Sequence, residues 1–259
     1  MLVRMMCYVV GLYLAAMACL YVIQDDQLFA KMWVVNEQNI ESDTIKALSF
    51  DVEGATLKGL YRKEGENAPL LLYFGGNAED ARAFVRATRS INGYDIMTLN
   101  YRGYVDSSGT PSEKALYADA LAQYDAFGKG KEVIVVGRSL GTGIATYVAS
   151  QREVKGLVLI TPYDSILSIA KQMYPYFPID MLLKHPFESV KYIPHVKAPI
   201  GIFEVENDTM IPRVHLEALM AKIPTPFLHV KLTNTTHNHV FEHPQFIQEL
   251  QTTLGKIRE

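Results

Sequence analysis

Short apolar runs alternate with amphipathic segments along most of the chain, and this alternation restricts the fold more than any other feature. Runs of strand length occur at 68–74, 94–100, 131–137, 154–160, 198–205 and 227–232. Segments with helical spacing of apolar residues occur at 78–91, 112–127, 140–151, 213–223 and 244–257. Such alternation predicts an α/β fold, in which a mostly parallel sheet is flanked by helices. Residues 44–62, with Gly54 at a turn, are expected to form a preceding β-hairpin.

The first residues differ from the rest. From Met5 to Ile23 the chain carries no charged residue, and Asp25 and Asp26 close the run. A run of nearly 20 apolar residues matches the hydrocarbon thickness of a bilayer and predicts an N-terminal transmembrane helix. We therefore expect two parts, an N-terminal membrane anchor or signal segment at 1–26 and an α/β domain at 27–259.

Two details bear on how this segment is used. Ala16-Met17-Ala18 resembles a signal-peptidase site, but the apolar run continues to Ile23, which favours a single-pass anchor that is not cleaved. Arg4 precedes the run and acidic residues follow it, so the positive-inside rule predicts a cytoplasmic N-terminus. The α/β domain is then expected on the non-cytoplasmic side of the membrane.

Charge and cysteine content exclude several classes of function. The net charge of −3 offers no basic surplus for nucleic acid. Both cysteines, Cys7 and Cys19, lie in the apolar run, so the remainder has no disulfide, cysteine-based zinc site or thiol nucleophile. The histidines outside the segment discussed below lack metal-ligand spacing; they are His185, His195, His215, His229 and His243. We expect no metal and no organic cofactor.

The stretch VIVVGRSLGTGIA, Val133 to Ala145, places one serine between glycines where a predicted strand meets a predicted helix. Gly137 to Gly141 fits G-x-S-x-G in the strand–turn–helix context that this motif requires. A sharp turn of this kind exposes the Ser139 hydroxyl at the start of the helix. Ser139 could also be an ordinary helix N-cap, but its position after a strand favours a nucleophile.

A serine nucleophile needs a histidine base that is held by a carboxylate. Asp208 and His237 each follow a predicted strand, and the order serine, acid, histidine is that of the α/β-hydrolase fold. Asp164 and Glu206 are alternative acids. His239 is an alternative base, and in an extended loop its side chain would point away from that of His237.

The oxyanion of an acyl-transfer intermediate needs two backbone donors. The N–H of Leu140, directly after the nucleophile, is one candidate. The loop after the strand at 68–74 contains Gly75, Gly76 and Asn77, and glycines allow close approach of the backbone. We expect the Asn77 N–H to be the second donor.

These segments together resemble the membrane-anchored α/β-hydrolase-domain serine hydrolases, which include lipid hydrolases and protein depalmitoylases and have a prolyl-aminopeptidase-like hydrolase domain. The resemblance extends over nearly the whole chain and rests on LLLYFGGNAED, NYRGYVDSSGTPSEKALYADA, GRSLGTGIA, PIGIFEVENDTMIP and THNHVF. It implies that Ser139, Asp208 and His237 form the catalytic triad, with Asn77 and Leu140 at the oxyanion. It also implies hydrolysis of carboxylic esters or thioesters of acyl or lipid type through an acyl-enzyme.

The chain departs from the family pattern at four places. Gly75-Gly76 and Glu204-Val205 stand where family members usually have His-Gly. Val105 and Thr235-Thr236 stand where family members usually have glycine. They are expected to alter the pocket or the oxyanion geometry rather than the reaction class. Residues 161–195 are too few for a large lid, which indicates an open site. The aromatic residues of 173–177 are expected to line an acyl pocket or to form an apolar packing patch. A membrane-tethered peptidase and a non-catalytic binding protein of the same fold remain alternatives. The oligomeric state is left open.

Overall fold

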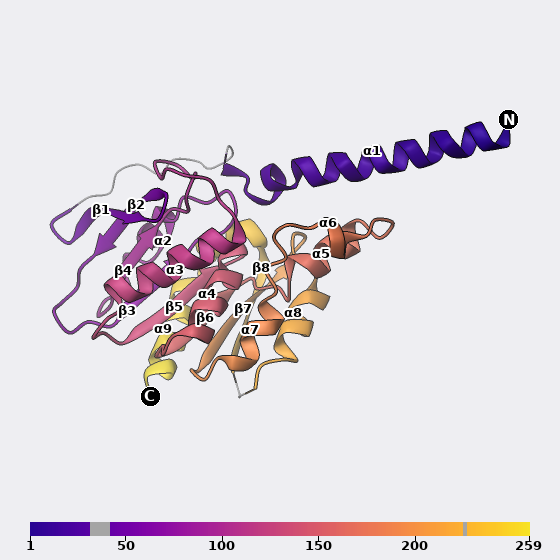
Figure 1. The fold of residues 1–259 in the computed structure, drawn as a ribbon. Coiled ribbons are helices and arrows are strands. Elements are labelled where there is room, and N and C mark those ends of the chain that lie inside the picture. Colours follow the sequence, from indigo (N-terminus) through magenta and orange to yellow (C-terminus); the bar gives the residue numbers. More distant parts are fainter. Residues whose placement is uncertain (32–41, 225–226) are drawn as a thin grey trace.

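The computed structural model describes residues 1–31, 42–224 and 227–259, and within them one twisted sheet lies between two layers of helices (Figure 1). The strands are β1 (Ile45–Val52), β2 (Ala55–Arg62), β3 (Leu70–Phe74), β4 (Asp95–Leu99), β5 (Val133–Arg138), β6 (Gly156–Ile160), β7 (Ile200–Asn207) and β8 (Leu228–Thr236). The α-helices are α1 (Leu2–Leu28), α2 (Arg82–Ala87), α3 (Glu113–Phe127), α4 (Leu140–Gln151), α5 (Ile166–Met173), α6 (Ile179–Leu182), α7 (Ser189–Tyr192), α8 (Arg213–Met220) and α9 (Phe246–Arg258). The 3-10 helices whose bounds lie within the described residues are η2 (Ile193–His195) and η3 (His237–Glu242).

The strand order is β1-β2-β4-β3-β5-β6-β7-β8. The β1–β2 pair is an antiparallel hairpin closed at Val52 and Ala55, with Gly54 at φ 74°, and β2 is antiparallel to β4. All other neighbouring strands are parallel. The predicted α/β class with a mostly parallel, helix-flanked sheet is confirmed.

The apolar runs of the sequence form strands that are buried on both faces. Every residue of β3, β4 and β6 is buried, so these strands have no alternation of polar and apolar positions. Alternate side chains of one strand enter two separate cores: Leu70 and Leu72 pack with α3 and α4, whereas Leu71 and Tyr73 pack with α2 and α9. β3 and β5 are the two central strands of the sheet and are buried on both faces. Their carboxyl ends position the loops of the site.

One predicted helix is shorter than its pattern. Apolar spacing suggests a helix over 78–91, but α2 covers only Arg82–Ala87. The preceding residues are held in a loop, because Ala78 has φ 55° and the Ala81 N–H donates to Asn100 Oδ1 at 2.8 Å. This loop forms one side of the candidate active site.

Helix α1 is long and apolar enough to cross a membrane, and its most apolar window has no buried residue. It projects beyond the α/β body past α6, as the indigo helix in Figure 1. The helix ends at Leu28, two residues beyond the predicted boundary, and the next residue, Phe29, is only 2% exposed. The end of α1 is therefore packed into the domain that it precedes.

Specific contacts hold this end of α1 against α6 and the turn after it. The Gln24 side chain donates to Leu182 O at 3.0 Å and accepts from the Lys184 N–H at 2.8 Å. Further toward the N-terminus, Tyr13 stacks on Phe177 with ring centroids 5.3 Å apart. Because the Gln24 amide is paired with both a carbonyl and an N–H, these bonds fix both the position and the orientation of this end of α1 relative to α6.

Candidate active site

Ser139 stands at a strained turn between β5 and α4. Its backbone has φ 48° and ψ −119°, a conformation that a residue with a side chain rarely adopts. The Ser139 N–H donates to Ile160 O at 2.9 Å, which fixes the turn to the neighbouring strand. A Cβ at Gly141 would lie 2.1 Å from Phe74 O, so glycine allows α4 to approach β3 this closely. The turn presents the Ser139 hydroxyl at the carboxyl edge of the sheet.

His237 lies between Ser139 and Asp208. Its Nε2 is 2.8 Å from Ser139 Oγ, and its Nδ1 is 2.9 Å from Asp208 Oδ2. With the proton on Nδ1, the ring donates to the carboxylate and Nε2 accepts from the hydroxyl. The His237 ring is nearly buried, with 6% of the side chain exposed. The three side chains thus form one hydrogen-bonded chain.

The backbone of the loop after β7 holds the Asp208 carboxylate. Its second oxygen, Oδ1, accepts from the Met210 N–H at 3.0 Å and the Ile211 N–H at 2.8 Å. These bonds fix the orientation of the carboxylate and leave Oδ2 directed at His237. Asp208 is thereby oriented by its own turn.

The alternative acids are engaged elsewhere. Asp164 Oδ1 is 2.8 Å from His215 Nδ1 and accepts from the Ser165 N–H at 2.7 Å. Glu206 accepts from the Asn234 N–H at 3.1 Å. Asp208 is the one of the three candidate acids for which a hydrogen bond to His237 is present among the described residues.

The alternative base, His239, is exposed, and its Nδ1 is 2.8 Å from Thr236 Oγ1. The segment that carries both histidines is the 3-10 helix η3 and not the extended loop considered from the sequence. η3 is kinked at His239 (φ −106°, ψ 18°), and the two side chains make different contacts. His237 faces Ser139, and His239 faces solvent.

The predicted oxyanion donors lie on two loops that meet at Ser139. Leu140 begins α4, so its N–H has no acceptor within the helix. The Asn77 side chain orders the opposite loop: its Oδ1 accepts from Ala30 N at 2.9 Å, Ala78 N at 3.0 Å and Tyr104 Oη at 2.9 Å. A Cβ at Gly76 would lie 3.5 Å from Ser139 Cβ, so the two loops are adjacent.

A buried ion pair next to the nucleophile was not predicted from the sequence. Arg138 Nη1 donates to Glu79 Oε2 at 2.6 Å, with 10% and 7% of the two side chains exposed. Glu79 also accepts from the Gly76 N–H at 2.7 Å and from the Tyr73 hydroxyl at 2.5 Å. Arg138 Nη2 donates to His237 O at 3.0 Å. One pair therefore joins the nucleophile turn, the Gly76 loop and the histidine segment.

The Glu79 carboxylate stabilises the positive charge of the buried Arg138 side chain. Burial alone would lower the pKa of the Arg138 guanidinium, but the Glu79 carboxylate outweighs it, so the pKa of Arg138 is raised. Burial, together with Glu79, raises the pKa of the Tyr73 phenol well above its usual value. Both shifts favour a charged Arg138 and a neutral Tyr73 near neutral pH.

Backbone strain also occurs at a departure from the family pattern. Val105 stands where the resembling family usually has glycine, and its φ is 48°. Val105 thus keeps a left-handed backbone conformation, although glycine is the residue that favours it. The neighbouring Tyr104 explains the position of the turn, because its hydroxyl reaches Asn77 from there.

Comparisons with known proteins agree with this fold. The family model for the α/β hydrolase fold matches residues 69–184. An uncharacterised protein of Mycobacterium tuberculosis is 31% identical over 195 residues, which cover 72% of this chain and 69% of that protein. The chain belongs to the α/β-hydrolase family. It is an enzyme of the α/β-hydrolase type, as the predicted resemblance implied.

Relatives of named activity are found within the same family. The rat lysophosphatidylserine lipase ABHD12 is 31% identical over 226 residues, covering 73% of this hydrolase and 56% of the rat protein. This hydrolase therefore spans little more than half the length of that relative. Among solved structures, an esterase of Pyrococcus furiosus has a TM-score of 0.67 at 16% identity, covering 86% of this chain and 96% of that chain. An α/β hydrolase of Vibrio vulnificus has a TM-score of 0.64 at 18% identity, with 91% of each chain covered.

Proposed function

We propose that this hydrolase cleaves carboxylic ester bonds of lipids at a membrane, with Ser139 as nucleophile, His237 as general base and acid, and Asp208 as the residue that orients the histidine. The observation that carries the proposal is the hydrogen-bonded chain from Ser139 Oγ to His237 Nε2 at 2.8 Å and from His237 Nδ1 to Asp208 Oδ2 at 2.9 Å. This arrangement activates a hydroxyl whose proton a free serine does not give up.

The reaction follows from these positions in two steps. Ser139 Oγ attacks the ester carbonyl carbon while His237 Nε2 takes the hydroxyl proton, and the same proton then goes to the leaving alcohol. A water molecule attacks the acyl-enzyme, gives a proton to His237 and releases the fatty acid, and the proton returns to Ser139. Asp208 stabilises the imidazolium that forms in each step. The N–H groups of Leu140 and Asn77 are the proposed donors to the oxyanion.

Lipid esters are the favoured substrate class for two reasons. The relatives of named activity include lysophosphatidylserine lipases. The N-terminal helix is apolar enough to lie in a bilayer, which keeps the enzyme where such esters are found. A lysophospholipid, with one acyl ester and a polar headgroup, fits both facts. We propose that α1 is an uncleaved anchor and that residues 27–259 lie on the non-cytoplasmic side.

Labelling with a fluorophosphonate probe tests the nucleophile. Full-length protein in detergent is treated with the probe, and the labelled peptide is identified by mass spectrometry. Label on Ser139 supports the hydrolase proposal. A folded protein that takes no label supports a non-catalytic binding role.

Substrate class is tested separately. The same preparation is assayed against lysophosphatidylserine, p-nitrophenyl esters of graded chain length, an acyl thioester and an amino-acid amide. Hydrolysis of the lipid and long-chain esters at rates well above the amide supports lipid-ester specificity. A preference for the amide would instead favour the peptidase alternative.

A further inference from the structure

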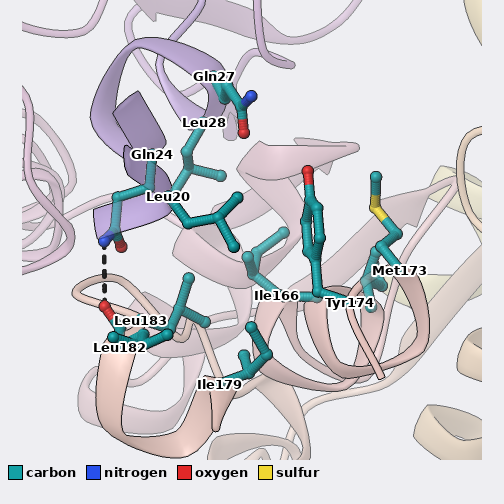
Figure 2. A pocket seen from close by; sticks show the side chains of 12 residues that line it. Leu20, Gln24, Gln27, Leu28, Ile166, Met173, Tyr174, Ile179, Leu182 and Leu183 are labelled. Carbon is teal, nitrogen blue, oxygen red and sulfur yellow. Dashed lines mark hydrogen bonds between the residues drawn. The ribbon is translucent and has the colours of Figure 1, made fainter. Parts of the chain in front are cut away.

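An apolar cavity of about 230 Å³ lies between the end of α1 and the segment that contains α5 and α6. Figure 2 shows Leu20 and Leu28 of α1 on one side and Ile166, Tyr174 and Ile179 on the other. The lining also includes Gln24 and Gln27 of α1, but most of it is aliphatic or aromatic. Resting on the proposed lipid-ester function, we infer that this cavity holds the acyl chain of the substrate and that the anchor helix α1 forms one of its walls.

Both walls of the cavity belong to segments that contact the candidate active site elsewhere along the chain. On the α1 side, Leu28 is two residues before Ala30, whose N–H donates to the Asn77 side chain in the proposed oxyanion loop. On the other side, Ile166 follows the end of β6, where Ile160 O accepts from the Ser139 N–H. In this proposal a chain bound in the cavity has its ester end toward Ser139, since both wall segments continue to residues that contact the site.

The depth of the cavity relative to a bilayer follows from the length of α1. At 1.5 Å per residue the apolar run from Met5 to Ile23 spans about 28 Å, close to the hydrocarbon thickness of about 30 Å. The last part of α1, which contains Gln24, Asp25 and Gln27, then lies among the headgroups. The cavity begins at Leu20 and therefore lies where acyl chains meet the headgroup region.

Exposed apolar side chains also occur on the segment that contains α5 and α6. Met173 lines the cavity and is nevertheless 65% exposed, so it stands at the mouth. Tyr176 and Met181 nearby are 86% and 85% exposed. Apolar residues grouped at the surface beside a membrane helix are expected to contact lipid. The mouth of the cavity thus opens toward the bilayer, which supplies the proposed lipid substrate.

The wall formed by α1 is held in place and is not a loose tether. Gln24 bonds to both Leu182 O and the Lys184 N–H, and Lys184 Nζ lies 3.0 Å from Asp25. These contacts place α1 against α6 in one register. The segment at 173–177, for which the sequence left a pocket or a packing patch open, supplies Met173 and Tyr174 to the cavity.

Two filling substitutions test the inference. Ala170→Trp occupies the cavity from α5, and Leu20→Trp occupies it from the anchor helix. Ala18→Trp is the matched control, because Ala18 is exposed on α1 and does not line the cavity. For each full-length protein in detergent, kcat/KM is measured for p-nitrophenyl butyrate and p-nitrophenyl decanoate, together with the melting temperature.

We expect both cavity variants to lose at least about tenfold in decanoate hydrolysis relative to butyrate hydrolysis, in line with the cost of displacing several buried methylene groups. The control is expected to keep the ratio of the parent. An unchanged ratio in a cavity variant that melts like the parent overturns the inference. A parent that hydrolyses neither ester overturns the proposed function instead.

A second readout does not depend on turnover. Ser139→Ala protein is illuminated with palmitic acid that carries a diazirine at the end of its chain. Label on peptides from 20–28 and 166–183 supports the inference. Label that is absent from both peptides, or that Ala170→Trp in the same background does not reduce, overturns it.

Discussion

Arg138 Nη2 donates to the main-chain oxygen of His237 at 3.0 Å, so the residue next to the nucleophile holds the residue that activates it. The same guanidinium is paired with Glu79, which accepts from the Gly76 N–H. The distance from Ser139 Oγ to His237 Nε2 and the position of the Gly76–Asn77 loop therefore depend on one buried ion pair. We regard Arg138 and Glu79 as positioning residues, since neither contacts the reacting atoms.

Replacing Glu79 by Gln should lower both stability and kcat. The change leaves the Arg138 charge buried without its partner, which typically costs about 3–5 kcal/mol. We expect a lower melting temperature and, in the protein that remains folded, a kcat at least about tenfold lower with a smaller change in KM, because misplacement of the loops affects the transition state most.

Asp119→Asn is the control for this variant. It breaks the buried pair between Asp119 and Arg102, whose side chains are 4% and 11% exposed. It should destabilise the fold and leave kcat near that of the parent. If Glu79→Gln and Asp119→Asn lower kcat equally at equal loss of melting temperature, Glu79 has a purely structural role.

Loss of the Ser139 hydroxyl should abolish ester hydrolysis. We expect Ser139→Ala to lower kcat by at least about a thousandfold, since only binding and the oxyanion donors remain. Steady-state assays with p-nitrophenyl butyrate measure this. Activity within a few fold of the parent would remove Ser139 from the mechanism.

The strained backbone of Ser139 predicts a difference between two inactive variants. At φ 48° and ψ −119° a Cβ is unfavourable, whereas glycine adopts this conformation readily. Ser139→Gly should therefore melt at a higher temperature than Ser139→Ala, by an amount that reflects about 1 kcal/mol or more of relieved strain. Scanning calorimetry of the two proteins in one detergent measures the difference. Equal melting temperatures would mean that the turn stores no such strain.

The two histidines of η3 should respond very differently to alanine. His237→Ala removes the base and should cost about as much as Ser139→Ala, because members of a triad act as a unit. His239→Ala removes an exposed ring that contacts Thr236 and should leave kcat within about threefold. The kcat values of His237→Ala and His239→Ala are compared at saturating substrate. An inactive His239→Ala beside an active His237→Ala would assign the base to His239.

Acidification should weaken the packing of α1 through His185. Its Nδ1 accepts from the Glu113 N–H at 3.3 Å, and its Nε2 lies 3.3 Å from Asp25 Oδ1, an arrangement that suits the neutral ring. Burial lowers the pKa of His185, and Asp25 opposes this only in part. The unfolded chain therefore binds the proton first, near pH 6.5, and stability falls from there down to the folded pKa.

The measurement is the melting temperature of the parent and of His185→Gln at pH 7.5 and pH 5.5. Glutamine keeps a donor and an acceptor but does not titrate in this range. We expect the melting temperature of the parent to fall more on acidification than that of His185→Gln. An equal or smaller loss in the parent would mean that His185 makes no such contribution.

Local patterns were enough to predict the residues that now lie together at the site. G-x-S-x-G fixes a strand, a turn and a helix within a few residues, and the parallel sheet brings the ends of β7 and β8 to the same edge. Asp208 and His237 could be selected because each follows a strand. Position and the family resemblance already favour Asp208 over Asp164, although both follow strands. The structure separates the two by their contacts, because Asp208 bonds to His237 and Asp164 bonds to His215.

Contacts between distant residues with no periodic pattern could not be predicted. Glu79 and Arg138 are 59 residues apart, and Gln24 and Leu182 are 158 apart. A polar residue near the end of an apolar helix is usual, so Gln24 gave no sign that it fixes the helix to the domain. The cavity beside it results from that packing, and the sequence suggested only one of its walls, at 173–177.

The position of the Gln24 contacts near one end of α1 has a consequence for membrane asymmetry. A helix held rigidly at this end presents the proposed acyl site to a single leaflet, the one on the same side as the α/β domain. Lipids of the opposite leaflet would have to flip across the bilayer before they could be hydrolysed. The enzyme would thus release its fatty acid and its alcohol product on one face of the membrane, and its access to substrate would be set by the composition of that leaflet rather than by the total lipid of the cell.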